Sequence, residues 1–273
     1  MSATAREAVK AAEFLKQHEV EATAYKSIYD EELVNRISNG EFDLLIAVGG
    51  DGTMLRSSHL CAPMNVPILG INMGQLGFLT EASQAKWHAP LQSVLDGEFW
   101  LEERMMLHAE LWRADQCLGT WEVLNEIVAC RGRTVRPIQL NACVDSHQLA
   151  NYIADGLIAA TPTGSTAYAL AVGGPIISPE LRNILIIPIA PHLSVDRGII
   201  LPATAQVTIK VITSHQAVLS ADGQKPIKLL NGDQIQVAVS QHSARFVRFN
   251  SGGQFYQKIT NHMERNPITW DNA

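Results

Sequence analysis

The stretch LLIAVGGDGTMLR, residues 44–56, decides the fold of the first part of the chain. Five apolar residues, 44–48, run straight into a turn that contains three glycines, as expected of a buried strand that ends in a tight turn. The next residues, 52–62, have the pattern of a beginning helix. A strand, a glycine turn and a helix in this order indicate a parallel sheet with crossover helices.

A single carboxylate, Asp51, stands between the glycines of this turn. Glycines after a strand let backbone N–H groups approach a phosphate, and the start of a helix adds partial positive charge. Asp51 would repel that phosphate unless it had another task, such as taking a proton, holding a metal ion or accepting a bond from a sugar hydroxyl. From the turn alone, a helix N-cap explains Asp51 as simply. The spacing matches neither GxGxxG nor the P-loop.

Composition excludes several classes of protein. The chain has 273 residues, 47% apolar and 18% charged, which is typical of a globular protein. A net charge of -6 argues against a nucleic-acid partner. Because there is no apolar run of about 18 residues and no signal-peptide pattern, we expect a cytoplasmic protein with no membrane partner. The four cysteines form no CxxC pair, which favours reduced thiols over a metal site.

The pattern of elements divides the chain. Helix signals at 4–18 and 87–99 alternate with strand signals at 43–48 and 66–74. From about residue 104, strand signals follow one another at 105–113, 121–129, 137–145, 157–160, 184–190, 199–201, 205–213 and 234–239.

We therefore predict an α/β domain with a parallel, Rossmann-like sheet over residues 1–103, completed by the C-terminal tail 246–273. A mainly-β domain is expected over 104–245. An α/β domain of this kind normally opens with a strand, whereas this chain opens with a helix.

Two further motifs place polar or aromatic residues at strand ends. In NMGQLGFLTE, residues 72–81, Phe78 could stack on a base, although a core position explains it as well. In VLNEIV, residues 123–128, Asn125 and Glu126 interrupt an apolar strand. Burying both without partners is costly, so they meet either a ligand or water at a strand end. An amide beside an acid would suit a nucleoside.

The segment ADGLIAATPTGSTAYALAVGGPIISPE, residues 154–180, is the most informative. Its strand leads into a turn rich in hydroxyls and backbone donors, followed by the start of a helix, which suits a polyphosphate or sugar phosphate. Asp155 adds a second carboxylate. By contrast, LSADGQ at 219–224 reads as an ordinary β-turn.

Taken in order, GGDGTMLR, NMGQLGFLTE, LNEIV, DGLIAATPTGSTAYALAVGGPI, PIAPHLS and ADGQ resemble the NAD kinase family over roughly residues 42–225. The resemblance implies a two-domain fold with the site in the crevice between the domains. It also implies phosphorylation of the 2′-hydroxyl of the adenosine ribose of NAD, or of NADH, to give NADP. ATP or polyphosphate would be the donor, with a divalent cation, Mg or Mn. A homo-oligomer, dimer or tetramer, is implied as well.

Site residues follow from the same resemblance. Asp51 would accept the proton, Phe78 would line the adenine pocket, and Asn125 with Glu126 would hold the ribose. The full set implied for binding is Asp51, Gly52, Arg56, Phe78, Asn125, Glu126, Arg136, Asp155, Ala160, Thr166, Ala167, Tyr168, Ala169, Leu170, Ala171, Ala190 and Gln224. Many family members carry a basic residue where this chain has Ile153, which removes one contact to the substrate phosphates.

Two alternatives stand beside this interpretation. A lipid kinase of the diacylglycerol or sphingosine type shares GGDGT but would not need LNE and TPTGSTAY together. A nucleotide sensor without catalysis would keep the pocket and lack turnover.

Overall fold

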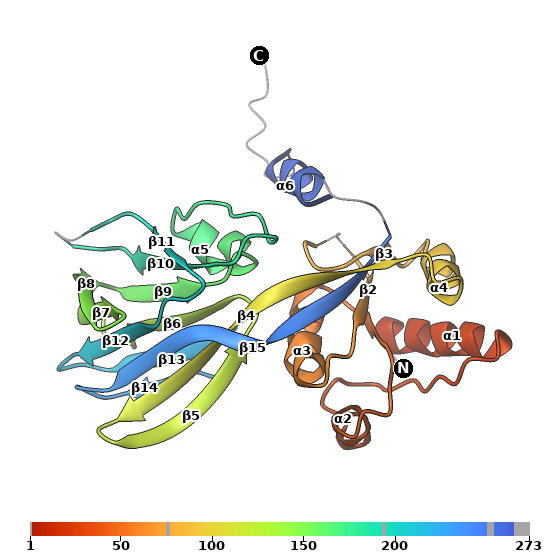
Figure 1. Cartoon of the computed structure of the whole chain (residues 1–273), viewed down its shortest axis with the longest axis horizontal. Helices are drawn as coiled ribbons and strands as arrows, with labels where there is room; N and C mark the ends of the chain where they lie inside the picture. Colours follow the sequence, from red (N-terminus) through yellow and green to blue (C-terminus); the bar gives the residue numbers. More distant parts are fainter. Residues whose placement is uncertain (1, 75–76, 193–194, 250–253, 265–273) are drawn as a thin grey trace, which may run out of the picture. The chain divides into compact units, whose positions relative to one another are not determined.

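The computed structural model describes residues 2–74, 77–192, 195–249 and 254–264 (Figure 1). The chain divides into two compact units. Unit 1 holds Met1–Glu102 and Arg245–Ala273, and unit 2 holds Glu103–Ala244. Of the tail expected to complete the first domain, residues 250–253 and 265–273 lie outside the described residues.

Unit 1 is built on a small parallel sheet. Strand β1 (Leu45–Val48) pairs in parallel with β2 (Ile68–Asn72), and β2 pairs in parallel with β3 (Ala82–Ser83). The end of β15 (Gln234–Arg248) also joins β2 in parallel, Phe246 opposite Ile68. The helices of this unit are α1 (Ala3–Gln17), α2 (Glu31–Ser38), α3 (Asp51–Cys61), η1 (Ala62–Met64), α4 (His88–Leu95) and α6 (Gln254–Glu264). The expected α/β fold with a parallel sheet is confirmed.

Side-chain spacing explains how α1 packs. The Ser2 hydroxyl caps the helix by accepting a hydrogen bond from the Ala5 N–H at 3.2 Å. Ala11 and Leu15, one turn apart, are buried against Leu69 and Trp87. A pocket of about 700 Å³ lies along the side of β1, lined by α1, α2 and residues 20–29. β1 is the terminal strand of its sheet among the described residues, and this pocket lies beside it.

Unit 2 is a β-sandwich. One sheet has the order β11 (Ile199–Pro202), β10 (Asn183–Ile189), β9 (Gly156–Ala160), β6 (Glu126–Arg131), β13 (Ala217–Ala221) and β14 (Ile227–Leu229), all antiparallel pairs. The facing strands are β4 (Trp100–Arg113), β5 (Gln116–Val123), β7 (Ile138–Val144), β8 (His147–Ala154), β12 (Val207–Ile212) and the first part of β15. The short helices η2 (Gly164–Thr166) and α5 (Tyr168–Ala171) complete this unit.

Alternation along the strands divides the apolar residues between two cores. On β6, Ile127 and Ala129 face the main core between the sheets, while Val128 faces a second cluster with Ala169 of α5. This is the period of two expected of a strand that is buried on both faces. The second cluster holds α5, and with it the hydroxyl-rich turn, against the outer face of the β6–β9–β10 sheet.

Several elements differ from those expected from the sequence. Helix α2 and strands β8, β13 and β14 were not predicted, because their segments are short or rich in polar residues. The strand expected over 121–129 is wrong: β5 ends at Val123 and β6 begins at Glu126. The break falls on Leu124 and Asn125. Their N–H groups donate hydrogen bonds to the carboxylate of Asp222, nearly a hundred residues later in the sequence.

Gly70 in the middle of β2 provides a test of the packing in unit 1. A Cβ at this position would lie 2.6 Å from Met54 Sδ and 3.1 Å from Thr80 Cα. We expect Gly70→Ala to lower the free energy of unfolding by about 1–3 kcal/mol in urea denaturation. Gly74→Ala is the matched control, because its Cβ would meet nothing within 4 Å, and it should change stability by less than about 0.5 kcal/mol. Equal effects of the two substitutions would contradict this packing.

Candidate functional site

Asp51 is held by the loop that follows β2. Its Oδ2 accepts a hydrogen bond from the Phe78 N–H at 2.8 Å, and its Oδ1 accepts one from the Leu79 N–H at 3.1 Å. A Cβ on Gly77 would overlap the Asp51 carboxylate, so this position requires glycine. The helix begins at Asp51, but its N-cap is Gly50 and no side chain caps it. Asp51 therefore serves the loop at 77–79 rather than its own helix.

The carbonyl groups of the same loop are bonded to cations of the C-terminal segment. Lys258 Nζ donates to Phe78 O at 3.2 Å and to Thr80 O at 2.9 Å. Arg248, which is buried, donates from Nη1 to Leu79 O at 3.0 Å. The backbone of 78–80 thus lies between the Asp51 carboxylate on its N–H side and two cations on its carbonyl side. Charge-assisted bonds of this kind are stronger than neutral ones, so the C-terminal segment helps to fix the loop that orients Asp51.

Three other predicted residues lie in unit 1. Gly52 and Arg56 are exposed on the first turns of α3. The Phe78 ring is half-buried and packs against Phe255 of α6, with 6.3 Å between ring centroids. This contact places the predicted adenine-pocket residue beside the C-terminal helix.

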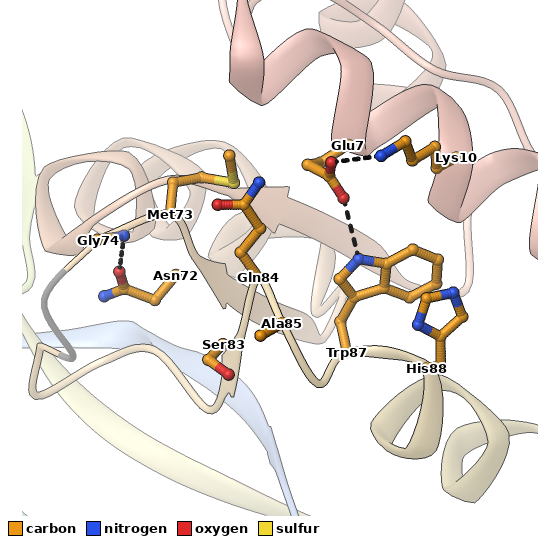
Figure 2. Close-up of a pocket in the computed structure, with 10 residues that line it drawn as sticks. All are labelled: Glu7, Lys10, Asn72, Met73, Gly74, Ser83, Gln84, Ala85, Trp87 and His88. Carbon is orange, nitrogen blue, oxygen red and sulfur yellow. Dashed lines mark hydrogen bonds and ion pairs between the residues drawn. The ribbon is translucent and has the colours of Figure 1, made fainter.

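A pocket of about 540 Å³ in unit 1 begins at the end of β2 (Figure 2). Asn72, Met73 and Gly74 line one side, and the Asn72 amide oxygen accepts a bond from the Gly74 N–H at 2.6 Å. On the other side, Glu7 accepts bonds from Lys10 Nζ at 2.8 Å and Trp87 Nε1 at 3.2 Å. The pocket therefore borders the NMGQLGF motif, but Asp51 and Phe78 do not line it.

In unit 2, one carboxylate holds the turn at Leu124 and Asn125. Asp222 Oδ2 accepts the Leu124 N–H at 2.7 Å, and Oδ1 accepts the N–H groups of Asn125 at 2.8 Å and Glu126 at 2.9 Å. The Asp222 N–H in turn donates to Glu126 O at 3.0 Å. Asp222 has a positive φ of 47°, which an aspartate tolerates better than most residues. This network produces the break between β5 and β6.

The hydroxyl-rich turn holds the same segment from another side. The buried Thr161 hydroxyl donates to Leu124 O at 2.5 Å and accepts the Gly164 N–H at 3.0 Å. The Thr161 N–H donates to Asn125 O at 2.9 Å. A Cβ at Gly164 would overlap the Asn125 backbone, so the close approach depends on glycine. The LNE and TPTGST motifs, 35 or more positions apart in the sequence, form one structural element.

Glu126 has an unusual environment. Its side chain is buried, with the residue only 7% exposed, and Oε2 has no hydrogen-bond partner in the described part of the chain. Burial, and after it the negative charge of Asp222, raise the pKa of Glu126 to about 8, although a bond from the Tyr168 N–H opposes them. The surroundings of the Glu126 carboxyl therefore favour its protonated form.

The remaining predicted residues of unit 2 lie around the outer face of the β6–β9–β10 sheet. Asp155 forms an ion pair with Arg131 at 2.8 Å, and the Asp155 N–H bonds to Ile189 O, one residue before Ala190. Burial is the main cause that raises the pKa of Tyr168, and the charges of Asp155 and Glu126 add to it. Ala160 pairs with Glu126 across β9 and β6. Thr166, Ala167, Ala169, Leu170 and Ala171 lie on η2 and α5 or between them.

Two predicted residues, Arg136 and Gln224, lie on exposed loops of unit 2. Arg136 is exposed before β7, and its N–H bonds to Thr134 O in the same loop. Gln224 is exposed in the turn after β13, two residues beyond Asp222, and its N–H bonds to Ala221 O. The structure therefore groups Asn125, Glu126, Ala160 and the 161–168 turn closely, while Arg136 stands apart from them in its own loop.

The described residues contain no group of three or more His, Cys, Asp or Glu side chains arranged to hold a metal ion. No helix in the described ranges is long and apolar enough to cross a membrane.

Comparison with known proteins assigns the chain to a family. Residues 2–99 match the profile of the ATP-NAD kinase N-terminal domain, and residues 124–249 match that of the ATP-NAD kinase C-terminal domain. The chain belongs to the ATP-NAD kinase family. The NAD kinase of Chloroflexus aggregans is 40% identical over 82% of this chain and 81% of its own length. That of Symbiobacterium thermophilum is 45% identical over 81% of this chain and 78% of its own.

Two solved structures of the NAD kinase family show the same fold. Yeast NADH kinase complexed with NADH has a TM-score of 0.78 and 29% identity, and the match covers 94% of this chain and 76% of the yeast chain. An NAD kinase from Archaeoglobus fulgidus in complex with ATP has a TM-score of 0.74 and 29% identity, covering 92% of both chains.

Three residues that hold the predicted site segments in place were not predicted from the sequence. Asp222 was read as part of an ordinary turn, Thr161 as one hydroxyl among several, and Lys258 was not considered. The signal for Asp222 was an acid before glycine in a strand-to-strand turn, which is too common to single it out. No local sequence pattern marks Lys258, because its role depends on contacts with Phe78 and Thr80 that form only in the folded chain.

The Thr161 hydroxyl should be important for stability. We expect Thr161→Val to lower the free energy of unfolding by about 2–3 kcal/mol, because the Leu124 carbonyl and the Gly164 N–H would both lose their partner in a buried place. Thr161→Ser keeps the hydroxyl and should cost only about 1 kcal/mol for the lost methyl group. Urea denaturation compares them, and a larger loss for serine would contradict the role of the hydroxyl.

Lys258 should control the loop that holds Asp51. We expect Lys258→Met to speed amide hydrogen exchange at Phe78 and Leu79 by about tenfold, because two charge-assisted bonds to this loop are lost. Lys258→Arg should restore most of the protection. Lys16→Met, at an exposed lysine of α1, is the control and should leave these amides unchanged. Unchanged exchange in Lys258→Met would show that the contact does not hold the loop.

Proposed function

We propose that this chain phosphorylates the 2′-hydroxyl of the adenosine ribose of NAD, with ATP as donor and NADP as product, and that Asp51 accepts the proton. The family and the names of its relatives support the reaction: NAD kinases at 40% and 45% identity, and a neighbour in complex with ATP. The observation that carries the role of Asp51 is its carboxylate, held by two backbone N–H groups at the start of a helix after a glycine turn.

The geometry of Asp51 suits a proton acceptor. Each carboxylate oxygen has about two acceptor positions, and each accepts one backbone N–H. One position on each oxygen is left for a hydroxyl. Because the loop at 77–79 fixes both oxygens, little reorganisation is needed when the hydroxyl arrives. A carboxylate is a weak base for a sugar hydroxyl, so its first task is to orient the oxygen, and the proton transfers late.

The bond changes follow from this placement. The 2′-oxygen attacks the γ-phosphorus, the bond between that phosphorus and the bridging oxygen breaks, and ADP leaves. The hydroxyl proton passes to Asp51. The exposed N-terminal turn of α3, with Gly52 and Arg56, supplies backbone N–H groups and a cation for the phosphates. In unit 2, Asn125, Glu126 and the turn at 161–168 hold the nucleoside.

The divalent cation belongs to the substrate in this proposal. The described residues offer no three-ligand cluster, and Mg²⁺ is commonly held by substrate phosphates with one or two carboxylates. We therefore write the donor as the magnesium or manganese complex of ATP, with polyphosphate as a second donor to test. We also propose that the chain forms a homo-oligomer in the cytoplasm and accepts NADH besides NAD, since one neighbour binds NADH.

Asp51→Asn tests the central residue. We expect kcat for NADP formation to fall by about 10²–10⁴-fold, because the amide cannot take the proton and its single oxygen can accept only one of the two N–H bonds from the loop. Asp43→Asn, at an exposed acid just before β1, is the matched control and should keep wild-type turnover. The assay is chromatographic detection of NADP from NAD, ATP and Mg²⁺. Near-wild-type kcat in Asp51→Asn would contradict the assignment, and a lipid alcohol phosphorylated in place of NAD would overturn the reaction.

A further inference from the structure

Two carboxyl groups meet at the turn between β5 and β6, and their hydrogen bonds differ. The Asp222 carboxylate accepts three backbone N–H groups, from Leu124, Asn125 and Glu126. Asp222 is itself buried, and its negative charge acts on the neighbouring Glu126.

The Glu126 carboxyl lies close to the Asp222 carboxylate, and few groups around it would stabilise a second negative charge. It accepts a bond from the Tyr168 N–H, and its Oε2 is buried without a partner among the described residues. The titratable residues that act on Glu126 are Asp222, on the β13–β14 turn, and Tyr168, on α5. The pKa of the Tyr168 hydroxyl is in turn affected by Cys130, Asp155 and Arg131. None of these places a positive charge directly against Glu126, and burial together with Asp222 raises its pKa to about 8.

We propose that Glu126 meets the nucleotide as a protonated hydrogen-bond donor, and that Asp222 is the positioning residue that keeps the proton on Glu126 and fixes the turn that presents it. This inference rests on the proposed function, which places Asn125 and Glu126 in the nucleoside site. The ligand atom it selects is an uncharged acceptor of the nucleoside, such as a ring nitrogen of the base or an oxygen of the ribose.

The protonated form also suits an anionic substrate. NAD and ATP carry negatively charged phosphates, and an ionised Glu126 above an ionised Asp222 would place two negative charges near them. Because a buried site screens charge poorly, each added charge would weaken binding. With the proton present, only Asp222 is charged, and its charge is already compensated by three N–H groups.

The pH dependence of NAD binding tests the proposal on the whole chain. Isothermal titration of NAD between pH 6 and pH 9.5, without ATP, should give a constant Kd below about pH 7. Above about pH 8, where Glu126 loses its proton, Kd should rise by about tenfold per pH unit. Tighter binding with rising pH would overturn the proposal.

Substitutions assign the effect to Glu126. Glu126→Gln keeps a donor of the same shape that cannot ionise, so it should bind NAD about two- to threefold more weakly at pH 7 and show no rise in Kd up to pH 9.5. Glu180→Gln, an exposed glutamate of the same unit, should keep the wild-type pH profile. Asp222→Asn should move the rise in Kd to lower pH, because the charge that favours the proton is gone. A Glu126→Gln variant that still follows the wild-type pH profile would overturn the assignment.

Infrared difference spectroscopy separates this inference from the proposed function. The wild-type spectrum at pH 7, minus that of Glu126→Gln, should contain the carbonyl band of a protonated carboxylic acid. This band does not depend on NAD. A carboxylate band in its place would overturn the proton on Glu126 even if NAD binds. Failure to bind NAD at any pH, with the acid band present, would instead overturn the nucleoside site.

Discussion

The carboxylate of Asp222 accepts hydrogen bonds from three successive backbone N–H groups, and the turn at Leu124 and Asn125 depends on it. Asp51 acts in the same way on the N–H groups of Phe78 and Leu79. In both cases the carboxylate oxygens accept hydrogen bonds from backbone N–H groups, which lets the side chain lie partly or fully out of water. Each of these two loops, one in each unit, is therefore fixed by a carboxylate from another part of the sequence.

Three acids, Asp51 in unit 1 and Glu126 and Asp222 in unit 2, differ because their surroundings differ. Asp51 accepts two N–H groups and is only partly buried, so acceptor positions remain for a hydroxyl. Asp222 is buried, and both of its carboxylate oxygens accept N–H groups of the turn. Glu126 is buried beside Asp222, one of its oxygens has no partner among the described residues, and both features favour the protonated form. In our proposals one acid takes a proton, one holds the backbone and one donates, and burial and neighbours rather than residue type distinguish them.

Local patterns predicted part of this arrangement. The apolar run before GGDGT predicted β1 and α3, and the hydroxyl-rich turn after β9 predicted η2 and α5, because these signals lie within a few residues. The break at Leu124 could not be predicted, because its cause is Asp222 nearly a hundred residues later and the local sequence favours a continuous strand. The bonds from Lys258 and Arg248 to the loop at 78–80 likewise join residues 169 to 180 positions apart. Contacts of this kind depend on the folded chain.

The position of the adenosine 2′-hydroxyl relative to Asp51 is the most direct test of the account. A crystal structure of this chain with NAD bound should place that hydroxyl oxygen about 2.6–3.2 Å from a carboxylate oxygen of Asp51. The bonds from the Phe78 and Leu79 N–H groups should persist in the same crystal. A 2′-hydroxyl bonded to a different side chain, while Asp51 still accepts the Phe78 and Leu79 N–H groups, would contradict the claim that Asp51 is the proton acceptor.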